Sequence, residues 1–178
     1  MLFEILQQGE MFVFKVNDYV VYGSTGVCQI TAIENDRSPN LDETEYYFLR
    51  PVYNNMNNMT IKTPVNNPKV LIRKVISKHD VSSLIAAMPE LETIWIDDSR
   101  ERSEHFKAIL RTGKCEEWIK LIRTLYLEQE EKSVVGKKLT KTDEEIMKTA
   151  EKHLCEEFAI ALNISPDEVI SYILDHVS

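Results

Sequence analysis

The chain has 178 residues, of which 28% are charged, and a formal net charge of −8 at pH 7. This length allows one ordinary domain or two small ones, and the negative charge argues against a general nucleic-acid binder. An odd number of widely spaced cysteines, Cys28, Cys115 and Cys155, argues against a disulfide framework and a zinc site and favours the reducing cytoplasm. We also expect no membrane contact, because no apolar run approaches the length of a membrane span.

Residues 1–10 precede the first regular pattern in the chain. They contain no basic segment followed by a long apolar run, so they do not resemble a secretory signal. Met11-Phe12-Val13-Phe14 resembles the native beginning of a protein. We therefore interpret residues 1–10 as an upstream extension or a misplaced start.

Residues 11–76 contain short runs rich in Val, Ile and Tyr, separated by Asn, Pro and Gly. Gly23 and Gly26 lie between the first two runs, where a tight connection requires positive φ angles. Five short strands with polar turns and one apolar face fit a small, highly curved barrel. The predicted strands are Asp18–Tyr22, Val27–Glu34, Glu45–Arg50, Met59–Thr63 and Val70–Arg73.

The pattern changes near Ser77, because apolar residues recur from there at helical spacing. We therefore predict two domains, residues 11–76 and residues 77–178. The first predicted helix spans Asp80–Ala87, with an aspartate at its N-cap. The fold class is α+β, a small β-barrel followed by an all-α domain.

Four further helices are predicted. The first begins at Asp98, and Gly113 stands where a left-handed residue would end it. The second carries Trp118 in a stripe of apolar residues, which predicts a core position for this side chain. Thr142 opens the third with the spacing of a capping box, and Ser165 opens the last, with proline at the first helical position.

The two predicted domains differ in charge. Residues 77–178 hold fourteen Lys or Arg against twenty-one Asp or Glu, whereas residues 11–76 hold seven against six. Within residues 100–141 the balance reverses, with eleven basic residues against seven acidic ones. A locally basic face on an acidic protein suits a DNA contact that a docked partner holds in place, because counterion release depends on the phosphates neutralised.

No group of residues has the spacing of a catalytic or metal site. The histidines His79, His105, His153 and His176 are scattered, without Cys or carboxylates at ligand spacing. Asp97-Asp98 is more typical of a helix cap than of a paired-carboxylate site, and no glycine loop has the context of a phosphate cradle. We therefore expect no enzyme activity, metal, cofactor or small-molecule substrate.

Seven motifs follow one another along the chain: Phe14–Ile30, Ile33-Glu34, Tyr46–Leu49, Met59–Pro64, Val70–Arg73, Phe106–Leu110 and Lys138–Leu162. Each alone is weak, but in this order they resemble the CarD/CdnL-type bacterial transcription regulators. The resemblance implies a Tudor-like barrel that docks on RNA polymerase and a helical domain that contacts promoter DNA. A barrel without an assigned partner fits the strands equally well, so only the resemblance names the polymerase.

The resemblance implies two basic contacts with the polymerase β subunit. Lys62 lies in Met59–Pro64, where the family has a basic strand residue. Arg37, just after Ile33-Glu34, approximates a second basic contact, although Asp36 fits the same position equally well. For Lys62 and Arg37 the alternative is a solvated surface cation.

The resemblance also implies a wedge residue. Many family members contain Trp-Ser-Arg-Arg-Tyr-Lys-Ala-Asn-Leu, whose second part matches Phe106–Leu110 and whose tryptophan falls at Arg102. In the family this tryptophan acts at the edge of the melted promoter, against an unstacked base step. Here Trp95 either does so from a longer preceding loop, or the wedge is absent and Arg102 gives only a minor-groove or phosphate contact. Burial of Trp95 between the domains is the alternative to a wedge.

Phosphate contacts are implied by the same motif. Lys107 matches the family lysine, and Arg100 and Arg102 are its near neighbours. Arg111 and Lys114 extend that face. Ordinary solubilising charge is the alternative for each of these residues.

Taken with the resemblance, the pattern predicts a cytoplasmic transcription regulator that stabilises the open complex. Its barrel would bind the RNA polymerase β subunit, and its helices would bind the upstream edge of the promoter bubble. The alternative is a polymerase-binding or other protein-interaction adaptor without significant DNA binding, which the acidic helical half favours.

Overall fold

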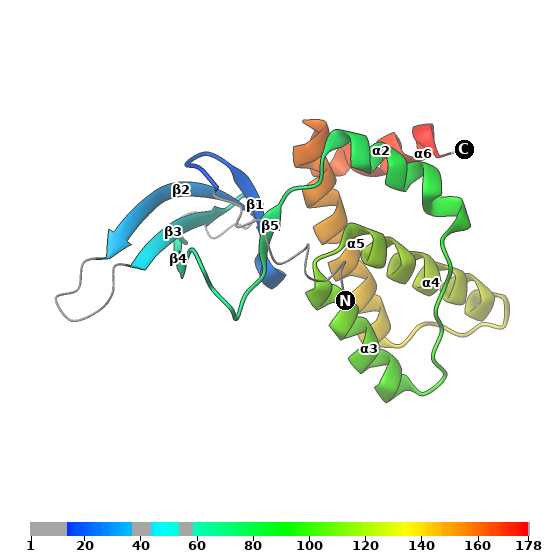
Figure 1. The fold of residues 1–178 in the computed structure, drawn as a ribbon. Coiled ribbons are helices and arrows are strands. Elements are labelled where there is room, and N and C mark those ends of the chain that lie inside the picture. Colours follow the sequence, from blue (N-terminus) through cyan, green and yellow to red (C-terminus); the bar gives the residue numbers. More distant parts are fainter. Residues whose placement is uncertain (1–13, 37–43, 54–58, 178) are drawn as a thin grey trace, which may run out of the picture.

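The computed structural model describes residues 14–36, 44–53 and 59–177. Figure 1 shows an antiparallel sheet at one end of the molecule and a group of helices at the other. The strands are β1 (Tyr19–Tyr22), β2 (Gly26–Asp36), β3 (Thr44–Pro51), β4 (Ile61–Pro64) and β5 (Ile72–Lys74). The helices are α2 (Lys78–Ala87), α3 (Ser99–Thr112), α4 (Cys115–Val134), α5 (Lys141–Leu162) and α6 (Val169–His176), with 3-10 helices η1 (Gly23–Thr25), η2 (Met88–Glu90) and η3 (Pro166–Glu168). This order of strands and helices confirms the predicted α+β class.

The sheet has the strand order β4-β3-β2-β1-β5, and each predicted strand has a counterpart in it. Strands β2 and β3 are longer than predicted, and their ladder reaches Asp36 opposite Thr44. The register shifts between Ile30 and Ala32, a bulge of the kind that bends a strand and increases its twist. Long paired strands and a bulge give the curvature visible in Figure 1.

Within the described residues, the two outer strands of the sheet do not pair with each other. β4 pairs with β3, and β5 pairs with β1. A barrel requires its first and last strands to meet, and β5 has only three residues, all paired with β1. The sheet is therefore open, and a closed Tudor-like barrel is not confirmed.

Two hydrophobic clusters form, one in each part of the molecule. The sheet buries Phe14, Val20, Cys28, Ile30, Tyr47 and Leu49. The helices bury a larger cluster whose largest members are Trp118, Phe106 and Phe158. The core position predicted for Trp118 is confirmed, since its side chain is 1% exposed. None of the described helices is long and apolar enough to cross a membrane.

The helix ends follow local sequence signals. Asp98 caps α3 by accepting hydrogen bonds from two backbone amides of its first turn, and Gly113 ends α3 at a φ of 66°, as predicted. The start predicted for α5 is wrong by two residues, because Thr140 rather than Thr142 accepts the capping bond, from the backbone amide of Asp143. Both threonines have an acidic residue three positions later, so the local pattern fits either.

Candidate functional site

The outer strand β4 carries Lys62 on the surface of the sheet. Lys62 is exposed and lies opposite Phe48 in the ladder between β3 and β4. Its Nζ atom lies 4.2 Å from the centre of the Tyr46 ring, a distance typical of a cation–π contact. Strands at the edge of a sheet present backbone groups that can pair with another chain. Lys62 therefore lies on the outer strand of the sheet, as far as the described residues form it.

The second residue predicted to contact the polymerase, Arg37, lies outside the described residues. Strand β2 ends at the preceding residue, Asp36.

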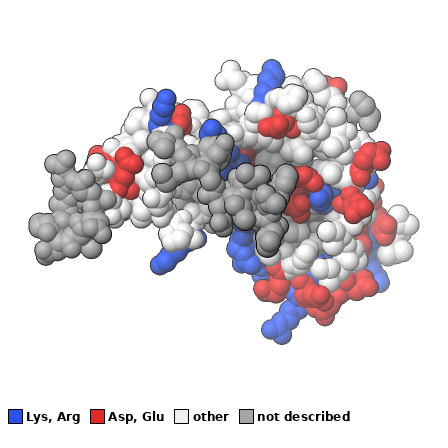
Figure 2. All heavy atoms as spheres, viewed as in Figure 1, with Lys and Arg blue, Asp and Glu red and all other residues white. Residues whose placement is uncertain are grey.

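Three of the predicted DNA contacts share one face of α3. Arg100, Lys107 and Arg111 are all exposed, and steps of seven and four residues keep side chains on the same side of a helix. Glu104 is exposed on that side as well. We call Arg100, Lys107 and Arg111 the α3 face. Figure 2 shows acidic and basic atoms mixed over this part of the molecule, so the face is not a uniformly basic patch.

Lys114 lies just beyond this helix, at the N-cap position of α4. It is exposed, and its side chain makes no capping hydrogen bond to α4. Lys114 thus remains a candidate to extend the α3 face.

The structure places Arg102 inside the helical part, with its side chain only 4% exposed. Its Nη2 donates to Asp143 Oδ2 at 2.9 Å, and its Nη1 donates to the carbonyl oxygen of Ile96 at 2.7 Å. A phosphate contact by Arg102 does not fit this burial, so we remove it from the candidate DNA contacts. The reason is helical geometry, because Arg102 lies about 200° around α3 from Arg100.

Trp95 is half-buried in the segment that leads to α3. Its ring centre lies 4.2 Å from the Arg102 guanidinium and 5.0 Å from Lys132 Nζ, and its Nε1 donates to Asp97 Oδ1 at 3.1 Å. These partners all belong to the helical part, so the alternative of burial between the two domains does not fit. One part of the ring packs on the helical core and another part reaches the surface.

An ion pair between the partly exposed Arg73 and the buried Glu157 joins the sheet to the helices, and no sequence motif predicts it. Arg73 in β5 makes two hydrogen bonds to the Glu157 carboxylate in α5, of 2.5 and 2.7 Å. Its Nε donates to the Gly113 carbonyl oxygen at 2.6 Å, at the end of α3. The Cys115 thiol donates to Glu157 at 3.2 Å, and the burial and the neighbouring carboxylate raise the pKa of this thiol.

A second point of contact lies where β2 begins. Gly26 has a φ of 87°, and a Cβ atom placed there would lie 3.1 Å from His153 Nδ1 and 3.3 Å from Glu156 Oε2. Glycine therefore lets helix α5 approach the sheet closely. His153 also stacks on Trp118, with ring centres 5.4 Å apart, and burial lowers its pKa.

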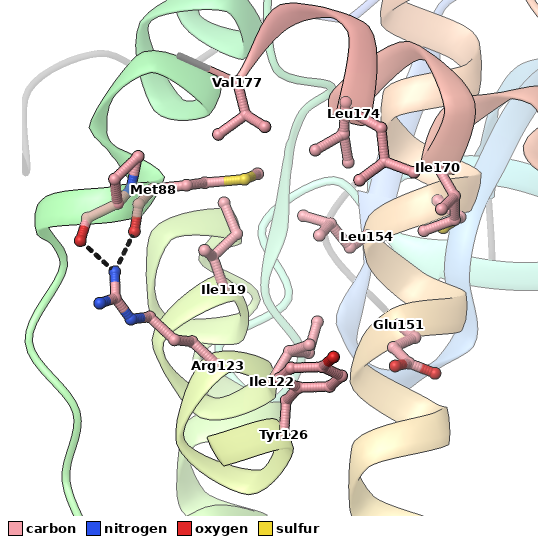
Figure 3. A pocket seen from close by; sticks show the side chains of 13 residues that line it. Met88, Ile119, Ile122, Arg123, Tyr126, Glu151, Leu154, Ile170, Leu174 and Val177 are labelled. Carbon is pink, nitrogen blue, oxygen red and sulfur yellow. Dashed lines mark hydrogen bonds between the residues drawn. The ribbon is translucent and has the colours of Figure 1, made fainter. Parts of the chain in front are cut away.

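An apolar cleft of about 400 Å³ lies on the helical part, between α4, α5 and α6 (Figure 3). Its charged lining residues are Arg123 and Glu151. Arg123 donates to the carbonyl oxygens of Met88 and Pro89, as the dashed lines show, and burial raises the pKa of Glu151. Few polar groups converge on the cleft, so its walls are better suited to hold an apolar group than to carry out catalysis.

The other side chains that could bind a metal or act in catalysis are dispersed over the structure. Among residues 14–36, 44–53 and 59–177, no three His, Cys, Asp or Glu side chains are grouped as a metal site would require. Cys28, Cys115 and Cys155 are free thiols.

Comparison with known proteins bears on the sheet. Residues 14–76 match the family model of the CarD-like/TRCF RID domain, an RNA polymerase-interacting domain. A search of curated proteins found no match. The matched residues include all five strands and Lys62, whereas α3 and Trp95 lie outside the match.

Proposed function

Because residues 14–76 match the family model of the CarD-like, RNA polymerase-interacting domain, as the resemblance predicted, we propose that this chain is a transcription regulator acting on polymerase and promoter together. In this proposal the sheet binds the β subunit, and the helices bind the upstream edge of the promoter bubble and stabilise the open complex. The family match to the sheet is the observation that carries the proposal. We further propose that the protein acts in the cytoplasm, without enzyme activity or cofactor.

The proposed docking surface is β4 with Lys62. An exposed outer strand can accept a strand from a partner, so that backbone bonds provide affinity and alternate side chains provide specificity. Lys62 adds a cation next to that strand. Charge at such a position mainly sets the partner choice and the rate of association.

The proposed DNA contact is the α3 face. Three cations next to Glu104 neutralise few phosphates, so duplex binding by the protein alone is weak and independent of sequence. The net charge of −8 opposes such binding further. Docking on polymerase compensates by holding α3 next to the promoter.

Trp95 is the proposed wedge. The family tryptophan aligns with Arg102, and the Trp95 ring lies directly against the Arg102 guanidinium. A tryptophan from an earlier chain position therefore lies beside the family position. An exposed part of an aromatic ring can pack on an unstacked base step at the edge of melted DNA.

The proposed mechanism is differential binding. Contacts available only after the promoter has opened lower the free energy of the open complex and shift the closed-to-open equilibrium. About 1.4 kcal/mol of such contact changes that equilibrium tenfold.

The decisive experiment combines a pull-down with open-complex lifetimes. The full chain should recover the polymerase β subunit from lysate and should lengthen the open-complex lifetime on a fixed promoter. Recovery of the β subunit with an unchanged lifetime would favour the second candidate, a polymerase-binding adaptor without significant DNA binding. The mixed charge over α3 is the observation that favours that candidate (Figure 2).

A further inference from the structure

Three separate contacts join the sheet to the helices. Arg73 in β5 binds Glu157, Gly26 in β2 meets α5 at His153, and Tyr53, just after β3, packs against the helical core. Because these contacts come from three places in the sheet, rotation of the sheet about one of them would break the others. The two parts of the chain therefore share one interface rather than touching at a point.

The chain segment that connects the sheet to the helices is short and constrained. Only residues 75–77 separate β5 from α2. The backbone amide of Ile76 donates to Glu157 Oε1 at 2.9 Å, and the Ser77 side chain caps α2. A flexible linker would have free backbone groups and several unconstrained residues, and this connection is held at two of its three positions.

Glu157 is the centre of the interface. Its side chain is 1% exposed, and its two oxygens accept bonds from Arg73, from the amide of Ile76 and from the Cys115 thiol. In a buried ion pair, desolvation offsets much of the Coulombic attraction, so the net gain in stability is small. Without Arg73, the Glu157 carboxylate would be an uncompensated buried charge, so arrangements that separate the pair while Glu157 stays buried are strongly disfavoured.

We propose that the Arg73–Glu157 pair locks the sheet and the helices into one rigid body, which makes Glu157 a positioning residue for the α3 face. Arg73 also binds the Gly113 carbonyl, so the pair ties the end of α3 directly to β5. The functional part rests on the proposed function: polymerase fixes the sheet, and the lock then fixes where the α3 face points. A loose joint would lower the effective concentration of the α3 cations at the DNA.

A distance distribution tests the lock in the full chain. Spin labels go on Glu45→Cys in β3 and Ala108→Cys in α3, which are both exposed positions, in a Cys155→Ser background. Cys28 and Cys115 are buried and stay in place, and only protein that carries two labels is measured, so that a label on Cys115 cannot broaden the distribution. We expect one narrow distribution for the otherwise native chain. Glu157→Gln keeps the side-chain shape but removes the charge, and we expect it to broaden the distribution.

Glu145→Gln is the matched control. It removes one charge from the same helix, but the Glu145 side chain is 67% exposed, and its Oε1 lies 3.9 Å from Lys141 Nζ. The distance distribution of the Glu145→Gln variant should therefore stay narrow. A narrow distribution for folded Glu157→Gln would overturn the lock, and a broad one for the native chain would overturn the rigid body. Arg73→Lys, which keeps the charge but loses the two-fold hydrogen bond, should broaden it as well and serves if Glu157→Gln does not fold.

Open-complex lifetimes then test the positioning role. At full polymerase occupancy, Glu157→Gln should shorten the lifetime toward its value without the protein, whereas polymerase affinity and duplex affinity should stay unchanged. A variant that was merely destabilised would lose the effect on lifetime, the affinity for polymerase and the affinity for duplex together. A native-like lifetime for Glu157→Gln would remove its positioning role. If even the native chain leaves the lifetime unchanged, the proposed function fails, and the distance result stands by itself.

Discussion

The guanidinium of Arg102 lies 4.2 Å from the centre of the Trp95 ring, and N–H groups at its edge donate hydrogen bonds to Asp143. A buried, hydrogen-bonded cation thus supports one side of a half-buried indole. The cation–π attraction is strengthened where the cation is desolvated. This arrangement orients the ring while part of it stays at the surface, which a wedge would require.

Trp95→Ala should shorten the open-complex lifetime while polymerase affinity and duplex salt dependence stay nearly unchanged. Loss of the cation–π contacts should lower the free energy of unfolding by about 1–2 kcal/mol, less than the about 3–5 kcal/mol of a fully buried tryptophan. Trp95→Phe keeps an apolar ring and is the matched control. A normal lifetime for folded, polymerase-competent Trp95→Ala would exclude the wedge.

Lys62→Glu should weaken polymerase binding, because a reversed charge at an interface replaces attraction with repulsion. Affinity for the isolated β subunit is the measurement, at two salt concentrations, since the effect should shrink as salt rises. Lys69→Glu makes the same charge change between β4 and β5 and is the control. Equal affinities for the native chain and Lys62→Glu would remove Lys62 from the docking surface.

Neutralising Arg100, Lys107 or Arg111 should each reduce the magnitude of the salt slope of duplex binding by about one. Glu104→Gln, on the same side of α3, should strengthen that binding, because it removes a repulsive charge. Lys141→Gln, on α5, is the control. Salt slopes that do not respond to any of the three changes would leave the α3 face without a DNA role.

Asp143→Ala should destabilise the fold by about 3–5 kcal/mol, because it leaves Arg102 buried without its carboxylate partner. Chemical denaturation measures this loss, with Glu144→Ala at the next, half-buried position as control. A loss below about 1 kcal/mol would be typical of an exposed pair and would contradict the burial of Arg102.

Local signals predicted the strands and several helix ends, because turns and caps depend on residues a few positions apart. The cap predicted at Asp80 is wrong, since Ser77 caps α2 three residues earlier. Gly113 and Asp98 act where their chemistry indicated. Arg102 was misread as a surface cation, although its spacing from Phe106 and Ile109 places it on the buried face of α3. That spacing was the available signal, and its acidic partner lies 41 residues away.

The contacts between the two parts had no such signal. Arg73 and Glu157 are 84 residues apart, and neither stands in a motif that predicts pairing. Gly26 was expected only to permit a turn, but the absence of its side chain also makes room for α5. Such contacts arise from tertiary packing, which the periodicity of one sequence does not encode.

The reactivity of the Cys115 thiol reports whether the interface between the sheet and the helices is open or closed. Because it is buried, protonated and bonded to Glu157, it is protected from alkylation while the interface is closed. Modification must then proceed through molecules whose interface has opened transiently. When reclosing is fast, the observed rate of modification equals the equilibrium constant for opening multiplied by the rate for an exposed thiol. The ratio of the observed rate to the rate of an exposed thiol gives the free energy of local opening under native conditions. A polymerase that binds only the closed form should slow the modification without contacting Cys115.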